Sequence, residues 1–334
     1  MACGQNEICP CQKIPILCFI RTPNKTPLAF HSVDMPPSYI VIYHGRQPRC
    51  SDGVAAAAIL LRAFPEAKLV PANHGDPFPP EAYRNQHVIL VDFALPREPL
   101  VALADAAASV VVLDHHKSAE RALQGLKHPK LQLILDMTRS GAQLAWDWVY
   151  PNTPRPWPVE MVADRDLWTW RLLWSPAVDK ATYVQGYHDS PQLFLDLLTS
   201  AAGQNPNGYK EFLLPGMAFM QAEERQIKEL LKVVPRARLV CGDRTYTVGV
   251  LSAPYEIRSA LGAALCDQYR DLDFAVLYQY DVVADAMYLS FRSSDKRPDI
   301  DLSVIATFFP GGGGHPTAAG ATLYGPQAAV PVTL

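Results

Sequence analysis

The sequence predicts an α/β domain with a parallel sheet and flanking helices, joined by a helical linker to a smaller α+β domain. Over the first 150 residues, near-continuous apolar runs alternate with helical stretches, as buried parallel strands do. After residue 235 the order changes to paired strands separated by helices. The 334 residues are enough for two domains that each bury a core.

The first domain is predicted over residues 38–205. Its apolar, strand-like runs are residues 39–43, 88–91, 109–113 and 131–135. Helices are expected at 53–64, at 96–107 and after Ser140, which is the expected cap of its helix. This alternation predicts a sheet covered by helices on both faces.

The linker is predicted over residues 206–234 and the second domain over 235–334. Residues 151–235 have a mainly helical pattern with breaks at Pro176, Pro191, Pro206 and Pro215, and a connecting helix is expected at 208–233. In the second domain, strands are expected at 238–241, 246–251, 274–280 and 286–291, and helices at 255–268 and 302–308. A glycine loop follows, and the sheet is predicted to be mixed or antiparallel.

Residues 1–37 are expected to form a disordered leader, because no periodicity is visible and polar residues are frequent. Its four cysteines, Cys3, Cys9, Cys11 and Cys18, lack the paired C-x-x-C spacing of zinc sites. We expect removal of residues 1–34 to leave function intact.

The overall composition is that of a folded, soluble protein, with 49% hydrophobic and 19% charged residues. The net charge of -3 provides no global basic field, which disfavours long duplex DNA as a partner. No apolar stretch approaches the roughly 20 residues of a membrane span, so a cytoplasmic location without membrane association is expected. The seven cysteines do not form a disulfide framework.

Acidic and histidine residues follow three successive predicted strands: His44, Asp52, Asp92, Asp114, His115 and His116. Open α/β sheets bind ligands at the carboxyl ends of their strands, so these side chains are expected to converge. Each alone has an ordinary explanation, since Asp52 fits a helix cap and an isolated histidine is usually structural. Together they suit manganese, magnesium, iron or zinc, and two such ions would clamp both oxygens of a phosphoryl transfer.

The four glycines 311–314 let backbone N–H groups approach an anion closely. A flexible turn is the alternative, and the adjoining His315 favours the anion site.

With these residues in view, the stretch 113–116 (Leu-Asp-His-His) resembles the signature of the DHH phosphoesterase superfamily. His44 with 51–53 (Ser-Asp-Gly), 91–92 (Val-Asp) and 162–168 (Val-Ala-Asp-Arg-Asp-Leu-Trp) resemble its other motifs. The stretch 311–320 is similar to the glycine motif of the associated domain in RecJ-like nucleases and NrnA-like nanoRNases. The resemblance spans about residues 39–325.

The resemblance implies a divalent-metal cofactor, with manganese the expected ion. One ion would be held by Asp52, Asp92, His115 and Asp164, with Asp92 bridging to a second ion at His44. Most relatives have an aspartate where this chain has Cys50. Because a thiolate suits zinc or ferrous iron better than manganese, Cys50 is either a ligand or a loop thiol that leaves only one ion.

The catalytic residues implied are Asp92, Asp114, His115 and His116. Asp114 is expected to orient the ring of His115, and His116 to contact a phosphate oxygen or protonate the leaving group. The resemblance assigns substrate binding to Arg292, Gly312, Gly313, Gly314 and His315. Asp166 is interpreted as pairing with Arg165 or Arg171 on the surface, and the tryptophans as core residues.

The expected function is that of a metal-dependent phosphodiesterase or phosphatase, a hydrolase acting on short oligonucleotides or nucleotides. One alternative is a protein that binds nucleotides or nucleic acid with catalysis weakened by Cys50. Another is a polyphosphate or pyrophosphate hydrolase. A homodimer is left open as the assembly.

Overall fold

The computed structural model describes residues 38–45, 50–73, 75–293, 297 and 299–325. The expectations for the leader and its cysteines lie outside these residues.

The first sheet has five strands in the order β2-β1-β3-β4-β5, and every neighbouring pair is parallel. The strands are β1 (Tyr39–His44), β2 (Lys68–Ala72), β3 (His87–Val91), β4 (Ser109–Asp114) and β5 (Leu131–Leu135). The prediction of a parallel sheet is confirmed, and β2 is an addition to it. β2 is an edge strand, which is where Pro71 is tolerated.

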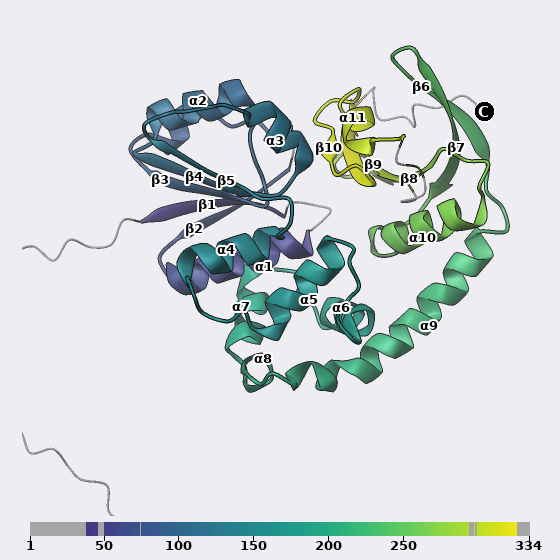
Figure 1. Cartoon of the computed structure of the whole chain (residues 1–334), viewed down its shortest axis with the longest axis horizontal. Coiled ribbons are helices and arrows are strands. Elements are labelled where there is room, and N and C mark those ends of the chain that lie inside the picture. Colours follow the sequence, from purple (N-terminus) through teal and green to yellow (C-terminus); the bar gives the residue numbers. More distant parts are fainter. Residues whose placement is uncertain (1–37, 46–49, 74, 294–296, 298, 326–334) are drawn as a thin grey trace, which may run out of the picture. The chain divides into compact units, whose positions relative to one another are not determined.

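Helices cover both faces of this sheet, as predicted (Figure 1). They are α1 (Ser51–Ala63), α2 (Arg97–Ala106), α3 (Lys117–Leu123) and α4 (Gly141–Val149), with a 3₁₀ turn η1 (Pro80–Tyr83). Leu100 and Leu103 of α2 are buried against one face, and α1 and α4 pack on the other. Complete burial of a leucine contributes about 1.5–3 kcal/mol, so these faces hold the domain together.

Small residues bring the starts of α1 and α4 close to the strand ends. A Cβ at Gly53 would lie 1.9 Å from the carbonyl oxygen of His44, and one at Gly141 would lie 2.6 Å from the Cβ of Asp92. Ser140 caps α4 in a capping box with Gln143, as predicted for the cap. The two helix starts are therefore fixed beside the carboxyl edge of the sheet.

A mainly helical segment follows, as predicted. It comprises α5 (Trp157–Asp166), α6 (Ser175–Val184), α7 (Pro191–Thr199), α8 (Ala201–Gln204), the 3₁₀ turn η2 (Gly208–Phe212) and α9 (Leu213–Leu230). Pro176 and Pro191 lie in the first turns of α6 and α7, where a missing N–H costs nothing. The expected helix 208–233 is instead η2 followed by α9, and Pro215 lies in the first turn of α9.

The second sheet has six strands in the order β10-β11-β9-β8-β7-β6. Its elements are β6 (Arg236–Cys241), β7 (Arg244–Ser252), α10 (Tyr255–Gln268), β8 (Phe274–Asp281), β9 (Ala286–Arg292), α11 (Leu302–Ala306), β10 (Gly313–Gly314) and β11 (Ala318–Tyr324). The pair of β7 and β8 is parallel and the others are antiparallel, so the predicted mixed α+β architecture is confirmed. The helix expected at 302–308 ends at Ala306.

None of the helices in the described part of the chain has the length and apolar character needed to cross a membrane.

Candidate metal and phosphate site

The carboxyl ends of three neighbouring strands supply the centre of the site. His44 ends β1, Asp92 follows β3, and Asp114 ends β4, directly before His115 and His116. Because β1, β3 and β4 are adjacent and parallel, these ends meet at one edge of the sheet.

Asp92 lies at the centre of these contacts. Its Oδ1 is 3.0 Å from Nε2 of His115, and its Oδ2 is 3.6 Å from Nδ1 of His44 and accepts a hydrogen bond of 3.2 Å from the thiol of Cys50. Burial acts to raise the pKa of Asp92, but hydrogen bonds from His115 and His44 hold it well below its ordinary value. Asp92 is therefore an anion at neutral pH.

The backbone of Asp92 is held at φ 51°, in the left-handed region that residues other than glycine seldom adopt. Its N–H donates to the carbonyl of Leu113 at 2.9 Å. Strained backbone of this kind gathers at functional sites, where the surrounding structure enforces it.

Four groups of described side chains have ligand atoms within 4.8 Å of one another and could hold a metal ion. They are His44 with Cys50 and Asp92, Asp52 with His115 and Asp166, Asp92 with Asp114 and His116, and His115 with His116 and His315. The structure thus brings together His44, Cys50, Asp52, Asp92 and His115, as the sequence predicts for the site.

The charges in this cluster suit a bound cation. Burial and the neighbouring Asp166 and Asp92 raise the pKa of Asp52 to about 8. Burial lowers the pKa of His115, but Asp92, Asp166 and Asp52 raise it to about 10. Protons on these two groups offset the crowded carboxylates, and a divalent ion would displace them.

A buried carboxylate oxygen that accepts no hydrogen bond from the described residues supports the same fit. Oδ2 of Asp166 is buried and, among the described residues, has no hydrogen-bond partner. It lies 3.4 Å from Nε2 of His115. A buried carboxylate oxygen without a donor is costly unless a cation satisfies it.

The structure does not bring Asp164 into the cluster, contrary to expectation. Its carboxylate accepts hydrogen bonds from Thr169 Oγ1 at 2.5 Å and from the N–H groups of Arg171 and Leu172 at 2.9 and 3.1 Å. Residues two apart on a helix face opposite directions, so only one of Asp164 and Asp166 can point toward Asp92. Asp166 is the residue that points toward the cluster, and its side chain is mostly buried rather than on the surface. Its Oδ1 lies 3.8 Å from Nη1 of Arg165, one of the two arginines with which it was expected to pair.

Asp114 orients His116 and not His115, which corrects the expected pairing. Its Oδ1 accepts from Nδ1 of His116 at 2.7 Å and from the N–H groups of His115 and His116. Burial lowers the pKa of His116, but Asp114 raises it above its ordinary value. The carboxylate therefore favours a protonated His116.

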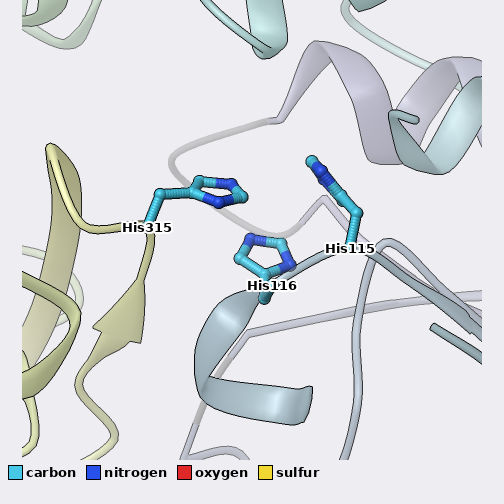
Figure 2. Close-up of side chains that lie close together, drawn as sticks. All are labelled: His115, His116 and His315. Atoms are coloured by element: carbon cyan, nitrogen blue, oxygen red, sulfur yellow. The ribbon is translucent and has the colours of Figure 1, made fainter. Parts of the chain in front are cut away.

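The glycine loop reaches this cluster through His315. Figure 2 shows His115, His116 and His315 gathered together. The rings of His315 and His116 are stacked, with 4.8 Å between their centroids. Burial, together with His116 and His115, lowers the pKa of His315 to about 3, so its ring is neutral at pH 7. Gly314 has φ 137°, which favours glycine, and its N–H donates to Oγ of Ser118 at 3.4 Å.

A cavity of about 500 Å³ lies between the cluster and the second sheet. One wall includes His44, Cys50, Asp92, His116 and Asp166, and the other includes Arg258, Arg292, Gly313, Gly314 and His315. Gly312 does not line it. A Cβ at Gly312 would lie 1.9 Å from the carbonyl oxygen of Ala306, so this glycine serves packing against α11.

Guanidinium groups give the cavity a positive wall. Arg258 is 2% exposed. Within the described part of the chain its hydrogen bonds go only to neutral groups, Ser290 Oγ and Gln279 Oε1, each at 3.3 Å, and its buried Nε has no partner. Arg292 donates to Ser259 Oγ at 3.0 Å, and burial together with the charge of Arg165 lowers its pKa to about 10. Arg165 also lines the cavity. Three cations around one cavity suit an anionic ligand.

Arg258 was not predicted as a site residue, although its place in the apolar pattern of α10 could have indicated it. Arg258 lies three and seven residues before Leu261 and Leu265, on the buried face of α10. A charged residue on the apolar face of a helix marks either a buried pair or a ligand site.

No protein-family model matches the chain. An uncharacterized protein of Acanthamoeba polyphaga mimivirus is 26% identical over 307 residues, which cover 87% of this chain and 69% of that protein.

Among solved structures, the chain is similar to the pGpG-specific phosphodiesterase PggH of Vibrio cholerae, with 14% identity, 86% of this chain and 93% of that chain covered, and a TM-score of 0.40. It is similar to RecJ of Thermus thermophilus in complex with Mn²⁺, with 14% identity, 86% and 49% coverage, and a TM-score of 0.47. It is also similar to the DHH domain of a member of the s1p family of ribosomal proteins, with 14% identity, 85% and 82% coverage, and a TM-score of 0.48. The solved structures that the chain resembles thus include DHH-domain proteins, and because each TM-score is below 0.5, the choice of function rests on the site itself.

Proposed function

We propose that this chain is a metal-dependent phosphoesterase of the DHH type that hydrolyses phosphate esters of short oligonucleotides or nucleotides. The observation that carries the proposal is the cluster of carboxylates and imidazoles that faces a wall of guanidinium and glycine groups across one cavity. The first wall suits divalent cations and the second suits phosphate.

Asp52, Asp92, His115 and Asp166 would hold one ion, and His44, Asp92 and Cys50 would hold another. Bound divalent ions, with manganese the expected one, supply positive charge and activate water for attack on phosphorus. Asp166 would take the place that the resemblance assigns to Asp164.

The protein's own groups would position the ester and move a proton. Arg292 and Arg258 bind phosphate oxygens, and Gly313 and Gly314 line the same wall with no side chain in the way of the ester. His116, whose protonated form is favoured by Asp114, would donate its proton to the leaving oxygen. Neutral His315 stacks on His116 and adds a hydrogen-bonding group without adding charge.

The test is a release assay with manganese on nucleotide bisphosphates, cyclic dinucleotides, RNA of two to five residues and polyphosphate. We expect turnover of at least one nucleotide substrate, and a loss of more than about 100-fold in the Asp92→Asn variant, because the shared carboxylate loses its charge. Asp105→Asn, an exposed change on α2, is the matched control. Hydrolysis of polyphosphate alone would favour the pyrophosphatase-like alternative, and full activity in Asp92→Asn would contradict the proposal.

Cys50 favours a second candidate, a nucleotide-binding protein with weakened catalysis. Burial and the charge of Asp92 raise the pKa of the Cys50 thiol well above its ordinary value. A protonated thiol is a poor ligand for manganese. If Cys50→Asp gains large activity while the wild type binds nucleotides but barely turns them over, this second candidate is correct.

A further inference from the structure

A second cavity of about 440 Å³ adjoins the phosphate site. Its walls come from the end of α5, from α6 and the segment between these two helices, from α9 and from the start of α10. Arg165, Trp168, Tyr255 and Ser259 line both cavities. A ligand held in the first cavity therefore has a path into the second.

Trp168 lies at the junction and is 43% exposed, which is unusual for so large an aromatic side chain. The ring of Trp170 supports it edge to face, at 5.0 Å and 73°. The expectation that the tryptophans are core residues is wrong for Trp168 and for Trp174, which is 42% exposed.

The segment that carries Trp168 is strained and firmly held. Trp168 and Trp170 have φ values of 55° and 48°. The carboxylate of Asp164 fixes this conformation by accepting hydrogen bonds from Thr169, Arg171 and Leu172. A strained backbone that is held by a buried carboxylate presents the indole in one orientation.

The second cavity has the chemistry of a base-binding site more than of a phosphate site. Trp170 and Tyr183 contribute aromatic surface, and Asp179, Glu224 and Glu256 contribute carboxylates. The two cations of this wall already have carboxylate partners, Lys180 with Glu223 at 2.6 Å and Arg165 with Asp179 at 4.0 Å, which leaves Glu224 and Glu256 for a ligand. Carboxylates repel phosphate but accept hydrogen bonds from the amino groups of a nucleobase.

We propose that the second cavity binds a nucleobase of the substrate, stacked on Trp168, while the adjacent phosphate lies in the first cavity. This inference rests on the proposed function and narrows it to substrates that carry a base, with amino-bearing purines favoured by the carboxylates. Aromatic stacking of this kind tolerates different bases, and the carboxylates add the preference.

The test compares a 5′-phosphorylated diadenylate with two analogues, each with one adenosine replaced by an abasic tetrahydrofuran unit. We expect the wild type to prefer the intact dinucleotide over one analogue by at least about 10-fold in kcat/KM. Trp168→Ala should reduce this ratio to near one, mainly through KM, and Trp168→Phe should restore most of it. Trp174→Ala is the matched control, because Trp174 is in the same segment at φ 69° and 42% exposed but does not line either cavity.

A binding measurement separates this inference from the proposed function. Calorimetry with calcium in place of manganese compares AMP with ribose 5-phosphate. Tighter binding of AMP by about 10-fold in the wild type but not in Trp168→Ala supports the base site, even if no substrate is hydrolysed. A different result is hydrolysis in which the ratio of kcat/KM between the intact dinucleotide and the abasic analogue is the same in the wild type, Trp168→Ala and Trp174→Ala. That result would refute the base site and leave the proposed phosphoesterase activity standing.

Discussion

Arg258 carries a charge with neutral partners only, and its replacement tests the positive wall of the cavity. We expect Arg258→Gln to raise KM for a nucleotide substrate by about 10-fold, with a smaller change in kcat, because its guanidinium binds phosphate in ground and transition states alike. The hydrogen bonds of its guanidinium to described residues go to the neutral groups Ser290 Oγ and Gln279 Oε1, so the glutamine leaves no counter-charge stranded and the melting temperature should hold.

Steady-state kinetics and a thermal melt check this prediction. Arg238→Gln, an exposed change on β6, is the control and should alter neither value. An unchanged KM in Arg258→Gln would mean that the guanidinium serves the fold alone.

Cys50 should determine whether the site prefers manganese or zinc. We expect Cys50→Asp to lower the manganese concentration needed for half-maximal activity by about 10-fold, since a carboxylate suits manganese better than a thiol. Metal titrations with manganese and zinc measure the change, and Cys241→Ser, far along the chain on β6, serves as the control. Titrations that are unchanged in Cys50→Asp would show that Cys50 is not a ligand.

Site residues at the ends of predicted strands could be predicted from the sequence. Site residues on a helix could not, because the orientation of the helix determines which side chain faces the cluster. Asp92, His115 and His116 follow apolar strands, and that position alone predicted that they converge. The choice between Asp164 and Asp166 depends on which side of α5 faces the cluster, and both lie near the end of the helix, where periodicity is weakest. Trp168 was misjudged because a single sequence does not reveal left-handed backbone.

Among the elements, those with long apolar runs were predictable, and α10 matches its predicted bounds. β2 escaped because it is a half-exposed edge strand that contains Pro71. β11 escaped because its Ala and Gly residues give little β signal, and Gly320 leaves room for the carbonyl of Leu289, 2.8 Å from where a Cβ would lie.

Asp147 of α4 joins the segment before α4, through Arg139, to the segment before α5, through Arg155. Its carboxylate accepts from Arg155 Nε and Nη2 at 2.9 and 2.6 Å and from Arg139 Nη1 at 2.8 Å. Burial acts to raise the pKa of Asp147, but these two arginines hold it below its ordinary value of 3.8. The stability it contributes is present above that value and is lost as the pH falls through the lower pKa of the folded state.

We therefore expect Asp147→Asn to destabilise the protein by about 1 kcal/mol at pH 7, a figure reduced for partial exposure. The difference from the wild type should shrink as the pH falls from about 4 to about 2. Urea unfolding over this range measures it, with the exposed turn variant Asp243→Asn as control. A difference that does not depend on pH would exclude the charge as its source.

At the scale of the whole molecule, helices α3 and α11 connect the two walls of the cavity. Arg121 of α3 contacts Asp301 Oδ2 at 2.5 Å and Ser303 Oγ at 2.9 Å. α3 directly follows His116, and α11 comes shortly before the glycine loop. This ion pair therefore links the two walls that the substrate must touch together.

We expect Arg121→Gln to raise KM by about 2- to 5-fold with little change in melting temperature, because the pair is partly exposed and contributes little to folding. The wild-type KM should also rise with salt more steeply than that of the variant, since salt screens the pair. Kinetics at two ionic strengths measure this, with Lys232→Gln as the control. Equal salt dependence in both proteins would rule out this role.

The division of the site along the chain has a consequence during synthesis. The last carboxylate of the cluster, Asp166, leaves the ribosome about 150 residues before His315 and the glycine loop do. Because domains fold as they emerge, a nascent chain would acquire its metal-binding half first, while it still lacks the groups that grip phosphate. The site proposed for phosphate esters would therefore be complete only after the residues of the glycine loop have emerged.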